Sequence, residues 1–212
     1  MAHYDLEEQE QLDNIKTWWK MYGNQVTTVI TVFCVVVIAW QGWGWYQRSQ
    51  AAQASAVFHS LELAIADKDV QKTKTTAGQL TEKFEGTSYA SLGALLAAKQ
   101  SFDLGDLKTA KSQLGWAVNH GQDEIKDLAR LRLAVVLLDE KAYDDALKQL
   151  DGSHATAFDS RFQELKGDIY SAQGKRNEAR LAYKAAQDKL QSKLGPGLEL
   201  IQQKIDSLGG AA

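Results

Sequence analysis

Residues 26–45 read VTTVITVFCVVVIAWQGWGW, and this stretch decides how the rest of the chain is organised. It lies inside a longer window, residues 21–47, that contains no charged side chain. A helix rises about 1.5 Å per residue, so twenty residues extend about 30 Å, the thickness of the hydrocarbon core of a bilayer. We therefore predict one transmembrane helix over residues 23–47, with a tail of residues 1–22 before it and a domain of residues 48–212 after it.

Aromatic side chains stand at both ends of the apolar run. They are Trp18, Trp19 and Tyr22 before it and Trp40, Trp43, Trp45 and Tyr46 at its end. Amphipathic rings favour the two interfaces of a membrane. This arrangement favours a spanning helix over the core helix of a water-soluble domain.

A cleaved signal peptide is the main alternative for this segment. The small residues AQASA, at positions 52–56, fit the A-x-A pattern of a cleavage site. However, the apolar run is longer than the roughly 7–15 residues of such signals, and the bulky Trp45 and Tyr46 and the charged Arg48 follow it. We expect an uncleaved anchor, and a mature amino terminus near Val57 would show otherwise.

The basic residues next to the span predict its orientation. Lys16 and Lys20 precede it and only Arg48 follows it, and basic residues favour the cytoplasmic side. This count predicts a cytoplasmic amino terminus and a large domain beyond the membrane. The first 25 residues carry a net charge of −3, but acidic residues contribute little to the rule.

Apolar residues also recur at helical spacing in the acidic tail. Leu12, Ile15, Trp19 and Tyr22 share one face of a helix. This pattern predicts an interfacial helix that continues into the span. A docking motif for a cytoplasmic partner is the alternative.

Charge and cysteine content limit what the domain can do. Residues 26–212 carry 22 basic and 22 acidic side chains, so the domain lacks the positive charge that nucleic-acid binding favours. We expect no nucleic-acid partner. The single cysteine, Cys34, lies in the apolar run, so no disulfide forms within the chain and Cys34 is expected to be a small apolar filler of the span.

The domain has a helical composition throughout. Ala, Leu, Lys, Gln, Asp and Glu dominate it, and the whole chain contains one proline. No alternating run of β-branched residues beyond the span predicts a strand. We predict an all-α fold, with a single amino-terminal transmembrane helix followed by a domain of tetratricopeptide-like repeats.

Three segments of the domain share one layout, in which a helix and a tight turn precede a second helix with an alanine at a fixed place. They are LGALLAAKQSFDLGDLKTAKSQLGWAV, LARLRLAVVLLDEKAYDDALKQL and FQELKGDIYSAQGKRNEARLAYKAA. The alanines, Ala110, Ala146 and Ala179, are 36 and 33 residues apart, close to the 34-residue tetratricopeptide period. An ordinary antiparallel bundle is the alternative, and the regular spacing disfavours it.

Each segment combines a small residue on its first helix with a large residue on its second. The small residues are Ala98, Ala134 and Gly167, and the large ones are Leu114, Leu150 and Tyr183. Small residues let two helices approach closely. We place an opening pair at 51–85, repeats at about 91–124, 127–158 and 160–193, and a capping helix at 196–208 that begins at the single proline.

The sequence shows no pattern of a catalytic or metal site. The histidines, His3, His59, His120 and His154, are scattered without the spacing of zinc ligands. Neither a Gly-rich phosphate loop nor a nucleophile elbow occurs. We therefore expect no enzyme activity, no metal and no cofactor.

A stack of helix pairs offers a surface for binding other proteins, because the first helix of each pair lines the inner wall of the superhelix. In this chain the inward positions would be Leu92, Leu95, Lys99, Phe102, Leu128, Leu131, Val135, Leu138, Arg161, Glu164 and Asp168. The first eight are unusually apolar for a wall that faces water. Two explanations stay open: another helix of this chain fills the groove, or a partner protein binds there.

Four features follow one another in the chain: an acidic tail with a WW pair, a span with an aromatic exit, an Ala- and Gln-rich helix, and three repeats. Together they resemble the YfgM family, ancillary subunits of the bacterial SecYEG translocon. The resemblance covers the whole chain. The order and spacing of the parts carry it more than single motifs such as GDLKTAKSQL.

The resemblance implies a single-pass type II protein of the bacterial inner membrane, with a periplasmic repeat domain. It also implies association with SecYEG and with the membrane-anchored periplasmic chaperone PpiD, and assistance to exported proteins. Members are further thought to restrain a cytoplasmic response regulator, so a regulator acting through its tail is an alternative function. An envelope assembly scaffold unrelated to secretion is another.

Overall fold

The computed structural model describes residues 6–190 and 195–209, and the elements within these ranges are all helices, with no strand among them. The all-α class is thereby confirmed. The start of the predicted tail, the stretch at 191–194 and the last three residues lie outside the described ranges, as does His3. The chain divides into two compact units, residues 1–50 and 51–212.

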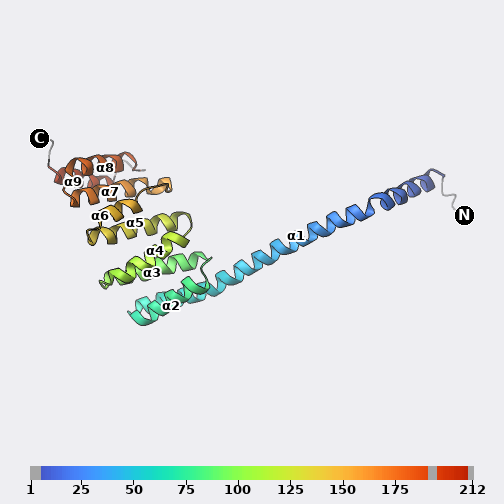
Figure 1. The fold of residues 1–212 in the computed structure, drawn as a ribbon, viewed down its shortest axis with the longest axis horizontal. Coiled ribbons are helices and arrows are strands. Elements are labelled where there is room, and N and C mark those ends of the chain that lie inside the picture. The colour runs from blue at the N-terminus through green and yellow to red at the C-terminus, as the bar shows by residue number, and fades with distance from the viewer. Residues whose placement is uncertain (1–5, 191–194, 210–212) are drawn as a thin grey trace. The chain divides into compact units, whose positions relative to one another are not determined.

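The helices are α1 Leu6–Ala66, α2 Val70–Lys83, α3 Ser88–Asp103, α4 Leu107–His120, α5 Asp123–Asp139, α6 Tyr143–Gln149, α7 Asp159–Ala172, α8 Arg176–Asp188 and α9 Pro196–Ser207, with a short 3-10 turn, Thr156–Phe158, before α7. Figure 1 shows α2 to α9 packed one after another in chain order. Helix α1 runs through the predicted tail and span and into the domain, so composition, and not a helix end, marks the membrane boundaries.

The first unit consists of the amino-terminal part of α1, and its apolar side chains are exposed. Phe33 and Ile38 are 67% and 70% exposed, and none of the most apolar stretch of the helix is buried. A core helix of a soluble protein would bury these side chains. By length and composition, α1 is the one helix in the described ranges that could cross a membrane.

The threonine hydroxyl groups within this apolar stretch are hydrogen-bonded to backbone carbonyls of the same helix. The hydroxyls of Thr27, Thr28 and Thr31 donate to the carbonyls four residues earlier, at 2.7, 2.8 and 2.8 Å. An unsatisfied polar group is costly in hydrocarbon, so this bonding lets threonine occur in a spanning helix.

In the described ranges, the second unit contains four helix pairs, each closed by the same turn, and then α9. Each turn has one residue with positive φ; in chain order these are Lys68, Gly105, Lys141 and Gly174. At the second of them, the N–H of Gly105 donates to Phe102 O at 2.9 Å and the N–H of Asp106 donates to Ser101 O at 2.8 Å. The other three turns repeat both bonds. The end of α1 and α2 therefore form an opening pair of the same design as the three later pairs.

We expect these turns to respond to glycine in opposite directions. Lys141→Gly should raise the free energy of unfolding by about 1 kcal/mol, because a left-handed backbone is strained for a residue with a Cβ, and Gly105→Ala should lower it by a similar amount. Thermal unfolding of the full chain in detergent, followed by circular dichroism, measures both. Gly78→Ala in α2 is the control, since Gly78 has ordinary helical φ and open space around it, and it should stabilise. A stabilising Gly105→Ala would contradict the argument.

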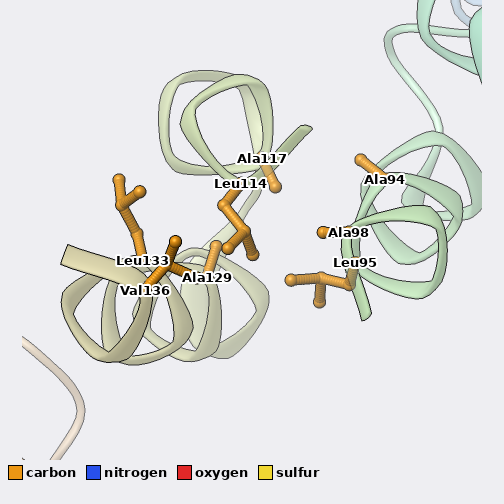
Figure 2. Close-up of a cluster of buried hydrophobic side chains, with 8 residues drawn as sticks. All are labelled: Ala94, Leu95, Ala98, Leu114, Ala117, Ala129, Leu133 and Val136. Atoms are coloured by element: carbon orange, nitrogen blue, oxygen red, sulfur yellow. The ribbon is translucent and has the colours of Figure 1, made fainter. Parts of the chain in front are cut away.

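Small side chains let the helices of each pair pack closely. Ala110, Ala146 and Ala179 are fully buried, and so are the large residues four positions later. Figure 2 shows the cluster that joins α3, α4 and α5, with Leu114 of α4 directed between its two neighbours. In the third repeat, a Cβ at Gly167 of α7 would overlap the ring of Tyr183 of α8. The predicted small and large positions therefore pack as expected.

The second repeat differs from the others because its second helix, α6, has only seven residues. Buried Arg130 of α5 holds the connection that follows. Its Nε donates to Gln149 O at 2.8 Å, and its terminal nitrogens donate to the carbonyls of Asp151 and Ser153. It also pairs with buried Asp127 at 3.3 Å, whose second oxygen accepts the N–H of Ala155 at 2.8 Å. These bonds tie the connection after α6 to α5, at a place where the other repeats have further turns of helix.

Candidate protein-binding face

The eleven residues predicted to line the inner wall lie on the first helices of the last three pairs. Leu92, Leu95, Lys99 and Phe102 belong to α3; Leu128, Leu131, Val135 and Leu138 belong to α5; Arg161, Glu164 and Asp168 belong to α7. The structure places most of them in one of three environments, which are the core, an open depression and the face of α7 beside α9, and leaves Leu92 exposed outside all three.

Two of the predicted leucines lie in the core, and two more are half-buried against it. Leu95 and Leu131 are only 3% and 9% exposed and belong to the core clusters of the neighbouring pairs. Leu128 and Leu138 are half-buried against the same clusters. Leu95 and Leu131 therefore belong to the core and not to a wall facing water, because the first helix turns these two side chains towards the adjacent pair.

Three of the predicted residues meet around one open depression. Lys99 and Phe102 of α3 face Val135 of α5 across a cavity of about 270 Å³. Its remaining lining residues are Ala98, Asp103, Leu114, Arg132 and Val136. Val135 is 38% exposed and Phe102 is half-buried, whereas the floor belongs to the core. Leu92 is partly exposed but lies outside this depression.

Arg132 is a cation of this depression that was not among the predicted wall residues. It is half-buried, and its Nη1 donates to Leu95 O at a long 3.4 Å. Burial lowers the pKa of its guanidinium. The signal in the sequence was a basic residue inside the apolar run LARLRLAVVLL, three positions before Val135.

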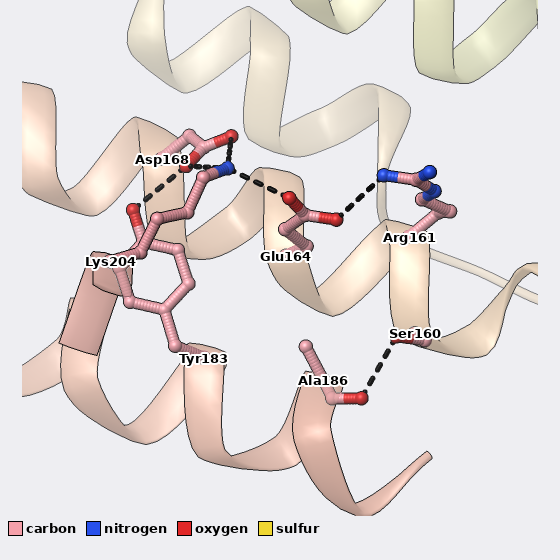
Figure 3. A network of polar contacts seen from close by, with 7 residues as sticks. All are labelled: Ser160, Arg161, Glu164, Asp168, Tyr183, Ala186 and Lys204. Carbon is pink, nitrogen blue, oxygen red and sulfur yellow. Dashed lines mark hydrogen bonds and ion pairs between the residues drawn. The ribbon is translucent and has the colours of Figure 1, made fainter. Parts of the chain in front are cut away.

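The third predicted group lies beneath α9. Lys204 of α9 donates to Glu164 at 2.8 Å and to both oxygens of Asp168 at 2.7 and 2.9 Å, as Figure 3 shows. Arg161 pairs with the other oxygen of Glu164 at 3.0 Å, and the hydroxyl of Tyr183 donates to Asp168 at 2.8 Å. At this end, Lys204 of α9 reaches Glu164 and Asp168, whereas Arg161 stays exposed at a cavity of about 420 Å³ between α7 and α9.

Burial and the two carboxylates together determine the pKa shifts of Lys204 and Tyr183. Burial alone would lower the pKa of Lys204, but its hydrogen bonds to Asp168 and Glu164 outweigh that effect and the pKa rises. Burial, followed by the bond to Asp168, raises the pKa of Tyr183 well above its ordinary value of 10.0. Folding therefore favours the protonated form of both side chains.

This network predicts a loss of stability at alkaline pH. A raised pKa in the folded state contributes stability that is complete below the unfolded-state value, 10.5 for lysine and 10.0 for tyrosine, and is lost as the pH rises through the folded-state value. We expect the free energy of unfolding to fall above about pH 10, as measured by urea titration at each pH. Lys204→Met should flatten this dependence. An unchanged pH profile in Lys204→Met would contradict the assignment.

The side chains on this face suit the binding of another protein. The described residues contain no group of three His, Cys, Asp or Glu side chains that could hold a metal ion. What the face presents is a partly exposed aromatic ring, an exposed valine and a half-buried cation. These are the contacts that a segment of another protein uses.

The fold and this face define a class: an all-α protein with one candidate membrane helix and a domain of stacked helix pairs. The family model described as a tetratricopeptide repeat-like domain matches residues 16–210, nearly the whole chain. A protein from Neisseria gonorrhoeae named ancillary SecYEG translocon subunit is 34% identical over 208 residues, which cover 96% of this chain and 98% of that protein.

Proteins of the same name from other bacteria are also similar over most of their length. The one from Escherichia coli is 27% identical, over 95% of this chain and 96% of that protein. The one from Haemophilus influenzae is 29% identical, over 87% of this chain and 90% of that protein. The chain belongs to the family of ancillary SecYEG translocon subunits, which confirms the resemblance to the YfgM family.

Proposed function

We propose that this protein is a non-enzymatic scaffold of the inner membrane that associates with the Sec translocon and binds other proteins through its repeat domain. One observation carries the proposal: the similarity to proteins named ancillary SecYEG translocon subunit extends over 96% of the chain, span and repeats included. The open depression between α3 and α5 supports the binding role.

The span positions the domain next to the translocon in this proposal. With Lys16 and Lys20 before the apolar run and Arg48 after it, the tail would be cytoplasmic and the domain periplasmic. Holding a binding face at the membrane raises the local concentration of every protein that leaves the channel nearby. The domain would then link exported proteins to periplasmic chaperones, with PpiD as the first candidate.

A second candidate function is regulation through the tail. The tail is helical in the described ranges, and Leu12, Ile15 and Trp19 are exposed on it. Such a face could bind a cytoplasmic response regulator. Exchanging residues 1–22 for an unrelated acidic helix separates the two: the regulator function predicts that regulation is lost, and the scaffold function predicts that regulation and chaperone contacts both stay unchanged.

Photocrosslinking in intact cells tests the scaffold function. A photoreactive phenylalanine at Val135, at the mouth of the depression, should give adducts with translocon subunits, a periplasmic chaperone or exported chains. The same group at Leu181 of α8, which is also exposed, is the matched control and should give few adducts. Equal labelling from both positions, or none of these adducts from Val135, would count against the proposal.

A further inference from the structure

Arg132 is an unusual cation for its degree of burial. Among the described residues, no carboxylate lies within 4.0 Å of its guanidinium, and its hydrogen bond goes to a backbone carbonyl of α3. Arg130, two residues earlier, instead has a carboxylate and three carbonyl acceptors. A half-buried charge without a counter-charge costs free energy, so the guanidinium of Arg132 would gain from a carboxylate supplied by a bound molecule.

The carboxylate that lines the depression is already paired. Asp103 lines the same depression, but Lys99 pairs with it at 2.6 Å. This exposed pair leaves the rim close to neutral apart from Arg132. The depression therefore carries one net positive charge, at its half-buried side.

The rest of the depression is apolar. Phe102 and Val135 form its walls, and buried Ala98, Leu114 and Val136 form its floor. Its volume of about 270 Å³ is below the roughly 300–1,000 Å³ of small-molecule sites, so it fits one or two side chains better than a cofactor. An apolar side chain would exclude water from Arg132 and strengthen any ion pair made there.

We propose that the depression between α3 and α5 binds a partner polypeptide that inserts an apolar side chain and places a carboxylate on Arg132. The carboxylate could be an Asp or Glu within four residues of the apolar side chain. This inference rests on the proposed role of the domain in binding proteins and names the chemistry of the bound segment. Arg132 supplies the charge, and Phe102 and Val135 supply the apolar contact.

A random 12-residue peptide library displayed on phage tests the proposal, with the full chain in lipid nanodiscs as the target. Selected peptides should combine a large apolar residue with Asp or Glu within four positions. For a synthetic peptide of this kind, Arg132→Gln should weaken binding at least about tenfold, the loss expected for one charged hydrogen bond. Arg132→Lys should lose less. Arg176→Gln, which changes an exposed arginine of α8, is the control and should bind normally.

The melting temperature distinguishes binding from a structural role. If Arg132 serves a ligand, Arg132→Gln should be as stable as the natural chain or more so, since it removes an uncompensated charge. A lower melting temperature, selected peptides without acidic residues, or binding unchanged by Arg132→Gln would overturn the proposal. So would loss of self-association in Arg132→Gln, which would make a second copy the occupant.

The outcome is separable from that of the proposed function. Translocon adducts from Val135 in cells, without enrichment of acidic peptides, would overturn the carboxylate proposal alone. Acidic peptides that depend on Arg132, in a chain that gives no translocon or chaperone adducts, would overturn the Sec-associated function and leave the binding chemistry in place.

Discussion

Arg130→Met is expected to lower the free energy of unfolding by about 3–5 kcal/mol, the cost of leaving one partner of a buried ion pair alone. The substitution would leave the carboxylate of Asp127 buried without its cation. It would also remove the donor that three carbonyls of the connection after α6 share. The melting temperature of the full chain in detergent should fall by roughly 10 °C.

Two further variants make this prediction specific. Arg176→Met changes an exposed arginine of α8 and should alter stability by less than about 0.5 kcal/mol. Asp127→Asn combined with Arg130→Met should recover part of the loss, because it removes the uncompensated charge. Fully additive losses in this double-mutant cycle would mean that the two side chains do not act as a pair.

Gly167→Ala should lower the free energy of unfolding by about 1–3 kcal/mol, although alanine is the better helix former. The reason is steric: the added Cβ would overlap the ring of Tyr183 on α8, and both residues are buried. Thermal unfolding followed by circular dichroism at the helix band measures the change. Gly115→Ala in α4, where a Cβ meets no atom within 4 Å, is the control and should stabilise.

The other repeats suggest the rescue for this variant. Where α7 and α8 combine Gly167 with Tyr183, the earlier pairs combine an alanine with a leucine, as in Ala98 with Leu114. Gly167→Ala together with Tyr183→Leu recreates that combination and should regain most of the lost stability. A double variant less stable than Gly167→Ala alone would contradict this explanation, in which a smaller residue on one helix makes room for a larger one on the other.

The architecture could be predicted from local patterns because each pattern has a direct physical cause. A helix whose apolar side chains face outwards is suited to a membrane, and residues 26–45 are long enough to cross one. Small residues recur where helices cross, which located Ala110, Ala146 and Ala179 in the core. These features depend on neighbours close in sequence, so spacing alone was sufficient.

The details of the candidate face depend on contacts that spacing does not encode. Leu95 and Leu131 were expected on the wall but lie in the core, since one residue corresponds to a rotation of about 100° on a helix and is enough to turn a side chain from the wall into the core. The contact of Lys204 with Asp168 joins residues 36 positions apart. The role proposed for Arg132 depends on its half-buried position without a nearby carboxylate. That position results from the packing of α3 against α5 and could not be predicted from the sequence.

Affinity capture from solubilised membranes tests the central claim most directly. A tag after residue 212 would be used to isolate the full chain, and a matched chain in which an unrelated apolar helix replaces residues 23–47 would be isolated in parallel. The proposed association predicts that the SecY, SecE and SecG subunits copurify with the full chain in amounts well above an unrelated single-span protein. Absence of all three, from membranes in which the translocon remains intact, would contradict it.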